Sequence, residues 1–97
     1  MIIKTKIHGT TFHKGYERIP LLNIGYKLEL VREPENQYDK NAIRINNGSG
    51  QQLGHVPRLD AAALAPLMDG GTEAEAFVSS IVGGGDLNWG VRIRIEY

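Results

Sequence analysis

The chain has 97 residues, the length of one small domain, and 41% of them are hydrophobic, which favours a packed core over a disordered tail. Eleven Lys and Arg residues balance eleven Asp and Glu residues, so the net charge is zero and a polybasic, histone-like binder is excluded. The absence of cysteine excludes disulfides, thiolate zinc sites and cysteine nucleophiles. No apolar run approaches the roughly 20 residues that cross a bilayer, and the N-terminus lacks a signal-peptide pattern. We therefore expect one soluble, cytoplasmic domain over residues 1–97.

The zero net charge conceals an uneven distribution along the chain. Up to Arg58 there are nine basic and five acidic residues, a net charge of +4, and after Arg58 there are two basic and six acidic residues, a net charge of −4. This division is compatible with one basic face that meets a polyanion and one acidic face that does not. It is equally compatible with chance in so short a chain.

Alternation of apolar and polar residues predicts β-strands along most of the chain. In chain order, the expected strands lie around Ile3–Ile7, Tyr26–Leu30, Ala42–Asn46, Gln51–Val56, Ala76–Val82 and Val91–Glu96. The third and fourth should form a hairpin, because the residues between them, Asn46-Asn47-Gly48-Ser49-Gly50, tolerate positive φ angles and are typical of turns.

One segment, Pro57–Gly71, carries helix signals instead: it is rich in alanine, begins with proline and ends with paired glycines. The apolar residues expected on one face of this helix are Leu59, Ala62, Ala63, Pro66 and Leu67. Pro66 cannot donate a hydrogen bond to the carbonyl of Ala62, so we expect a kink there or a division into two short turns. The elements together predict a mainly β fold, a small closed or half-open barrel of about six strands with one short, Pro-kinked helix at one end.

Two long polar connections fit neither strands nor the helix. One runs from Gly9 to Gly25, and the other, Arg32–Asn41, contains an aromatic residue, Tyr38. Long loops on a rigid barrel are where binding residues usually lie, so we expect the functional site on these two connections.

The second connection and the strands around it carry a distinctive motif. Pro34–Ile43 has the pattern Pro-x-Asn-x-Tyr-Asp-x-Asn-Ala-Ile, and Gly-His-Val-Pro follows at Gly54–Pro57. This combination resembles the HIRAN domain, which occurs at the front of certain eukaryotic helicase-like DNA translocases that remodel stalled forks in DNA repair, and also as small free-standing proteins. The resemblance covers nearly the whole chain and implies a modified, OB-like β-barrel, in agreement with the strand count.

The resemblance also implies binding to the 3′ end of single-stranded DNA. Matched by position, Tyr38 and Phe12 are aromatics that would stack on terminal bases. Asp39 would accept a hydrogen bond from the free 3′-hydroxyl, with Asn36 as a polar contact beside it. Base–aromatic stacking contributes about 1–3 kcal/mol per base whatever the base. A carboxylate repels phosphate, so its presence in such a site makes more sense opposite a hydroxyl.

His55 and Arg58 match positions that would hold phosphates. The chain departs from the eukaryotic members at Thr11, where they carry an Arg, and the loss of a cation and a planar stacking surface predicts weaker binding. The segment Gly83–Trp89 also departs from the family pattern, so we transfer no contact to it.

Two plainer interpretations stand beside this one. The segment Tyr38–Asn41 could be a polar turn whose Asp and Asn side chains cap their own backbone, and a lone histidine such as His55 is more often a structural hydrogen bonder. At the level of function, the alternative is a protein-interaction or adaptor domain that kept the fold and lost the DNA site, which the zero net charge and Thr11 both favour.

Catalysis and metal binding have no support in the sequence. The three histidines, His8, His13 and His55, form no H-x-x-x-H or H-x-E pair, and no carboxylate pair or Ser/His/Asp arrangement stands out. We therefore predict a non-enzymatic binding module without metal or cofactor. Single-stranded DNA is its expected partner, a helicase or nuclease is a further candidate as partner protein, and a membrane is not expected.

Overall fold

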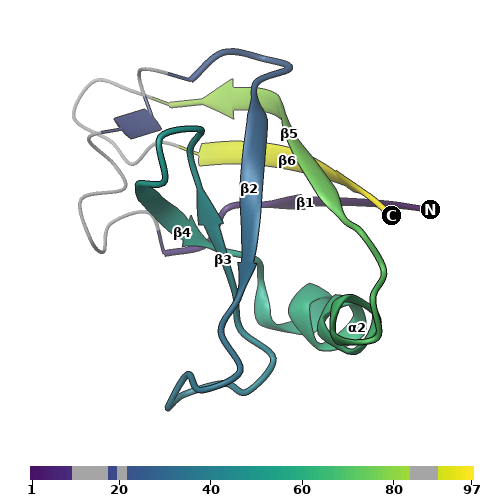
Figure 1. The fold of residues 1–97 in the computed structure, drawn as a ribbon. Helices are drawn as coiled ribbons and strands as arrows, with labels where there is room; N and C mark the ends of the chain where they lie inside the picture. Colours follow the sequence, from purple (N-terminus) through teal and green to yellow (C-terminus); the bar gives the residue numbers. More distant parts are fainter. Residues whose placement is uncertain (10–17, 20–21, 84–89) are drawn as a thin grey trace.

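The strands of the computed structural model, which describes residues 1–9, 18–19, 22–83 and 90–97, form one curled antiparallel sheet (Figure 1). Its strands are β1 (Ile2–Lys6), β2 (Lys27–Arg32), β3 (Ile43–Asn46), β4 (Gln52–His55), β5 (Glu75–Val82) and β6 (Gly90–Glu96). Their order in the sheet is β1-β6-β5-β2-β3-β4. Each predicted strand is confirmed, and the arrangement is the half-open form of the expected barrel.

Alternating burial along the strands places the core on the inner side of the curl. In β6 the side chains of Val91, Ile93 and Ile95 are buried, whereas Arg92 and Arg94 between them are exposed. The largest fully buried side chains are Ile19, Ile43, Ile45, Leu53, Leu64, Val78, Val91, Ile93 and Ile95. These apolar side chains remove a large hydrophobic area from water, which is the main force that holds the sheet curled.

The predicted hairpin joins β3 to β4 through a turn organised by Asn47. Its side-chain Oδ1 accepts hydrogen bonds from the backbone N–H groups of Ser49 (3.0 Å) and Gln51 (2.9 Å). The hairpin register then places Arg44 opposite His55. Turn chemistry at Asn47 therefore fixes which side chains of the two strands become neighbours.

The two edges of the sheet meet at one point beyond the end of β1. His8 and His55 exchange two backbone hydrogen bonds of 2.8 Å each, and so connect the chain after β1 to the end of β4. This bridge narrows one end of the half-barrel and brings two histidines side by side there.

The helix α2 (Arg58–Asp69) lies beside one end of the sheet (Figure 1). Its buried residues are Ala61, Leu64 and Ala65, so the predicted apolar face was wrong: Leu59 is 88% exposed and Leu67 is 43% exposed. Small and apolar residues occur on every side of this helix, and the periodicity therefore could not select the packed face.

Pro66 does not divide the helix, which runs without interruption to Asp69, so the division into two turns was wrong, whereas the alternative of a kink stays a prediction. Pro66 lies on the exposed side near the C-terminal end of α2, where the hydrogen bond that it removes is not needed to hold a buried segment.

The hydroxyl of Thr5 donates to Asp60 Oδ2 at 2.6 Å and ties the first turn of α2 to β1. Within the described parts of the chain, no helix combines the length and apolar character required to cross a membrane.

Candidate nucleic-acid interface

A cleft of about 480 Å³ opens where the His8–His55 bridge, the loop between β2 and β3 and the start of α2 come together. Five of the residues that the sequence singled out line it: Asn36, Tyr38, Asp39, His55 and Arg58. They come from three separate segments, and the fold places them around one space. The sixth predicted residue, Phe12, lies outside the described residues, as does Thr11.

Asn36 shapes the loop that forms one wall of the cleft. Its Oδ1 accepts hydrogen bonds from the backbone N–H groups of Tyr38 (2.8 Å) and Asp39 (3.1 Å), and its Nδ2 donates to Glu33 Oε1 (3.3 Å). Because both the oxygen and the nitrogen of its side-chain amide are hydrogen-bonded, Asn36 fixes the direction in which the side chains of Tyr38 and Asp39 project from the loop. A direct contact between Asn36 and DNA stays a prediction.

Asp39 is held in place by the turn that it caps. Its Oδ1 accepts a hydrogen bond of 2.9 Å from the backbone N–H of Asn41, and its Oδ2 lies 3.5 Å from Nε of Arg58. The interpretation of Tyr38–Asn41 as a polar turn capped by its own side chains is therefore correct for the local backbone geometry. The same carboxylate nevertheless lines the cleft, with one oxygen in the turn and the other facing a cation.

Tyr38 and Arg58 form the exposed rim of the cleft. The Tyr38 residue is 85% exposed, and the carbonyl oxygen of Tyr38 accepts a hydrogen bond from a guanidinium nitrogen of Arg58. Because Arg58 opens α2, this bond fastens the loop to the start of the helix. The tyrosine is thereby presented on an anchored backbone, with its ring available to stack on a planar ligand.

Behind the cleft lies a charged cluster that the sequence did not predict. His55 Nε2 is 2.6 Å from Oε1 of Glu33, and Nη1 of Arg44 is 3.5 Å from the other carboxylate oxygen. Burial raises the pKa of Glu33, but the hydrogen bonds from His55 and Asn36 and the charges of His55 and Arg44 outweigh it, so the pKa is lowered overall. The feature that could have indicated this cluster from the sequence is the predicted hairpin, because its register sets Arg44 opposite His55.

A second unpredicted contact fastens the far end of the loop. The guanidinium of Arg32 donates to both carboxylate oxygens of Asp69, at 2.9 and 3.0 Å, and also to the backbone carbonyls of Ala42 (2.7 Å) and Lys40 (3.0 Å). The hydrogen bond with Asp69 raises the pKa of Arg32 and lowers that of Asp69. One side chain thus joins β2, the loop and the last turn of α2.

Comparison with known proteins adds independent information on this chain. A family model described as the HIRAN domain matches residues 2–96. The helicase-like transcription factor of Mus musculus is 51% identical over 67 residues, which are 69% of this chain and 6% of that protein. A Fanconi-associated nuclease 1 homolog of Arabidopsis thaliana is 42% identical over 67 residues, which are 69% of this chain and 7% of that protein. The chain thus spans less than a tenth of these relatives.

Solved structures agree with the sequence comparison. The crystal structure of the HIRAN domain of human HLTF superposes with a TM-score of 0.78 at 29% identity, over 97% of this chain and 72% of that one. The NMR structure of the HLTF HIRAN domain in its DNA-bound conformation superposes with a TM-score of 0.69, again at 29% identity, over 97% of this chain and 71% of that one.

Proposed function

The chain belongs to the HIRAN domain family, and from this premise we propose that it is a nucleic-acid-binding module whose cleft receives the 3′ end of single-stranded DNA. The observation that carries the proposal is the convergence of Asn36, Tyr38, Asp39, His55 and Arg58 on one cleft. A related HIRAN domain has been solved in a DNA-bound conformation, which supports nucleic acid as the ligand class. The preference for a 3′ end is the finer part of the proposal and rests on the chemistry of the cleft.

Asp39 and Arg58 supply the two chemical groups that a 3′-terminal nucleotide requires. Such a nucleotide presents a hydroxyl, which donates a hydrogen bond, and on its other side an anionic phosphodiester. The carboxylate of Asp39 accepts from the hydroxyl, and the guanidinium of Arg58, 3.5 Å from it, attracts the phosphodiester. A 3′-phosphate end would bring a second anion toward the carboxylate, so the same arrangement disfavours it.

Tyr38 provides the contact to the base. Its exposed ring stacks on the terminal base, which contributes about 1–3 kcal/mol and does not depend on the identity of that base. His55 lines the same cleft and is assigned to the phosphate side with Arg58. The module therefore recognises an end and not a sequence.

In this proposal the domain binds and does not catalyse. A helicase or a nuclease supplies the chemistry, as a partner protein or as another part of a longer chain; the relatives that share this domain are named a helicase-like transcription factor and a nuclease homolog. A cytoplasmic location stays a prediction. The adaptor alternative is less well supported, because the predicted positions converge on one cleft and a related HIRAN domain has been solved in a DNA-bound conformation.

The test is fluorescence anisotropy with a short labelled single strand that carries either a free 3′-hydroxyl or a 3′-phosphate, titrated with the wild type and with Asp39→Asn. Asparagine can still accept the hydrogen bond from Asn41, so the variant should keep the loop. We expect the wild type to bind the hydroxyl end more tightly and the variant to lose this preference. Equal binding of the two ends by the wild type would remove the 3′-end assignment.

A further inference from the structure

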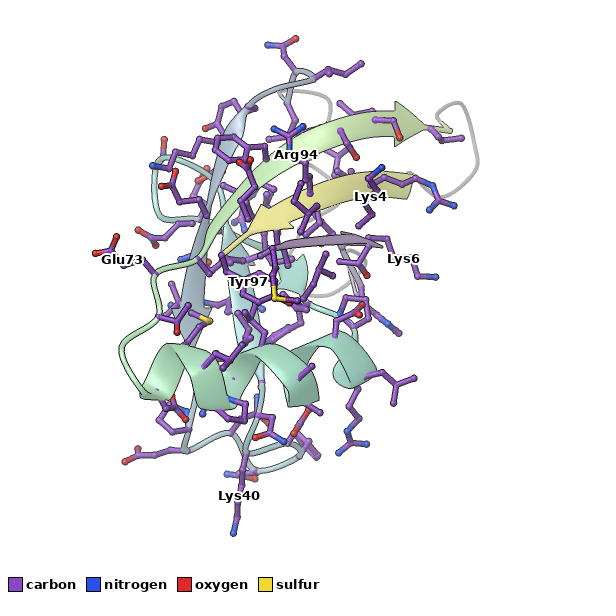
Figure 2. The ribbon with its side chains drawn as sticks, turned by 90° about the vertical axis from the view of Figure 1, so that its right-hand side faces the viewer. Lys4, Lys6, Lys40, Glu73, Arg94 and Tyr97 are labelled. Carbon is purple, nitrogen blue, oxygen red and sulfur yellow. The ribbon has the colours of Figure 1, made fainter. Side chains whose placement is uncertain are left out.

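The outer side of β1 and β6 carries a group of exposed cations that the cleft does not use. We define this cationic face by its four residues: Lys4, Lys6, Arg92 and Arg94. Figure 2 looks onto this side of the sheet, with Lys4 and Lys6 on β1 and Arg94 on β6 labelled. The face belongs to strands that are adjacent in the sheet although they lie at opposite ends of the sequence.

The register sets like charges directly opposite one another. Lys4 pairs with Arg94, and Lys6 pairs with Arg92, on neighbouring antiparallel strands. Like charges at directly opposite positions destabilise a sheet, so two such pairs in succession are a cost to folding that a polyanion would relieve. The sequence shows the excess of basic residues before Arg58, but no local pattern in it predicts that β6 brings its two arginines beside the lysines of β1.

Among the described residues, carboxylates neutralise only the end of this sheet that is remote from the cleft. Glu96 lies 3.8 Å from Arg94, and Glu75, which pairs with Glu96 in the register, forms a 3.2 Å ion pair with Lys27. Among the residues that the structure describes, Lys4, Lys6 and Arg92 form no ion pair. The uncompensated positive charge therefore increases along β1 toward its C-terminal end.

That end leads directly into the cleft. Lys4, Lys6 and His8 alternate with residues that turn inward, so the three side chains share one side of the same extended segment. His8 lines the cleft and is bridged to His55. Same-side residues of a strand are about 6.6 Å apart, twice the rise per residue, a spacing comparable to that of successive phosphates in an extended single strand.

An aromatic residue lies within the same surface. Phe77 on β5 pairs with Arg94, whose guanidinium carbon lies 5.5 Å from the centre of the ring. Cations interleaved with an aromatic are typical of surfaces that follow single-stranded nucleic acid, because they offer both phosphate and base contacts. This combination favours a nucleic-acid strand as the occupant of the face.

We propose that the cationic face is a second phosphate-binding surface, on which the backbone of the same strand lies a few nucleotides 5′ of the end held in the cleft. This inference rests on the proposed function, since it extends the path of the strand that the cleft receives. The face adds affinity for longer strands without adding any preference for sequence or for the type of end.

The test measures affinity against salt for a trinucleotide and for a dodecanucleotide of single-stranded DNA, both with a free 3′-hydroxyl. The variants are Lys6→Gln and the double variant Lys6→Gln with Arg92→Gln. The matched control is Lys27→Gln, which removes the same charge from an exposed strand lysine outside the cationic face. All three replace outward-facing side chains, and thermal unfolding verifies that each variant is folded.

We expect the wild type to bind the dodecanucleotide more tightly and with a steeper salt dependence than the trinucleotide. The slope of log affinity against log salt should fall by about 0.7 in Lys6→Gln and by about twice that in the double variant, with the trinucleotide and the control unaffected. If the trinucleotide binds but the variants keep the wild-type slope for the longer strand, the cationic face is refuted and the cleft stands. If neither oligonucleotide binds, the proposed function fails and this inference fails with it.

Discussion

Gly54 lies so close to His8 that a Cβ at Gly54 would stand 2.4 Å from the His8 carbonyl oxygen and 2.7 Å from a methyl group of Ile7. This approach is what allows His8 and His55 to exchange their two backbone hydrogen bonds. The closed edge of the half-barrel, and with it one wall of the cleft, therefore depends on a position without a side chain.

Replacement of this glycine should be costly for the fold. In Gly54→Ala the added methyl must displace backbone and not a flexible side chain, so we expect a loss of about 1–3 kcal/mol or more in the free energy of unfolding. Denaturant unfolding measures the loss. Gly90→Ala is the control, because among the described residues beyond its chain neighbours the nearest atom to its added Cβ, the Val82 carbonyl oxygen, is 3.7 Å away. Equal stability of the two variants would contradict the close approach.

The Arg32 side chain should be required both for stability and for binding. In Arg32→Gln the carbonyl of Lys40 loses the Arg32 donor, and that of Ala42 keeps only the backbone N–H of Glu33. We expect a cost of about 1–3 kcal/mol together with weaker binding of single strands, because the loop is released from α2. Asp69→Asn removes only an exposed partner and should cost clearly less. Thermal unfolding and anisotropy provide the two readouts. An Arg32→Gln variant as stable as Asp69→Asn would exclude this role.

The lowered pKa of Glu33 predicts a dependence of stability on pH. A carboxyl group whose pKa is lower in the folded than in the unfolded state stabilises the fold above its usual value of 4.5, and this contribution is lost as the pH falls through the folded-state value. The Tm difference between the wild type and Glu33→Gln should therefore be present above about pH 4.5 and shrink as the pH falls below it. A difference that stays constant down to strongly acidic pH would show that the charge of Glu33 does not contribute.

Tyr38 should affect binding alone. Because Tyr38 is 85% exposed, Tyr38→Ala should leave the Tm unchanged while weakening the binding of single-stranded DNA by about 1–3 kcal/mol, or roughly 5-fold to 150-fold. Tyr38→Phe keeps the ring and should bind like the wild type. Loss of the fold in Tyr38→Ala would instead identify the tyrosine as a packing residue, and unchanged binding would exclude it from the site.

The strands could be predicted well because the alternation of buried and exposed side chains is visible within a short stretch of sequence. In β6, for example, Val91 and Ile93 are buried on either side of an exposed Arg92, as the alternation requires. The helix was predicted in position but not in orientation, because apolar residues surround it and only the curl of the sheet decides that Leu64 packs inward while Leu59 does not.

The sequence predicted most of the residues that line the cleft but not how these residues are arranged in space. The family motif supplied Tyr38, Asp39 and their neighbours. The contacts that hold these residues depend on distances between segments: Arg32 meets Asp69 across 37 positions of the chain. Such contacts depend on the ends of β2 and α2 lying beside each other in the fold, and no local sequence pattern encodes this proximity.

The most direct test of the cleft as the binding site is a ¹H–¹⁵N correlation spectrum of the isotope-labelled protein, titrated with a trinucleotide of single-stranded DNA that carries a free 3′-hydroxyl. If the cleft is the binding site, the largest shifts fall on the backbone amides of Gly9, Tyr38, Asp39, His55 and Arg58. The amides of β5 that face away from the cleft should barely move. Large shifts elsewhere, with those five amides unchanged, would contradict this assignment.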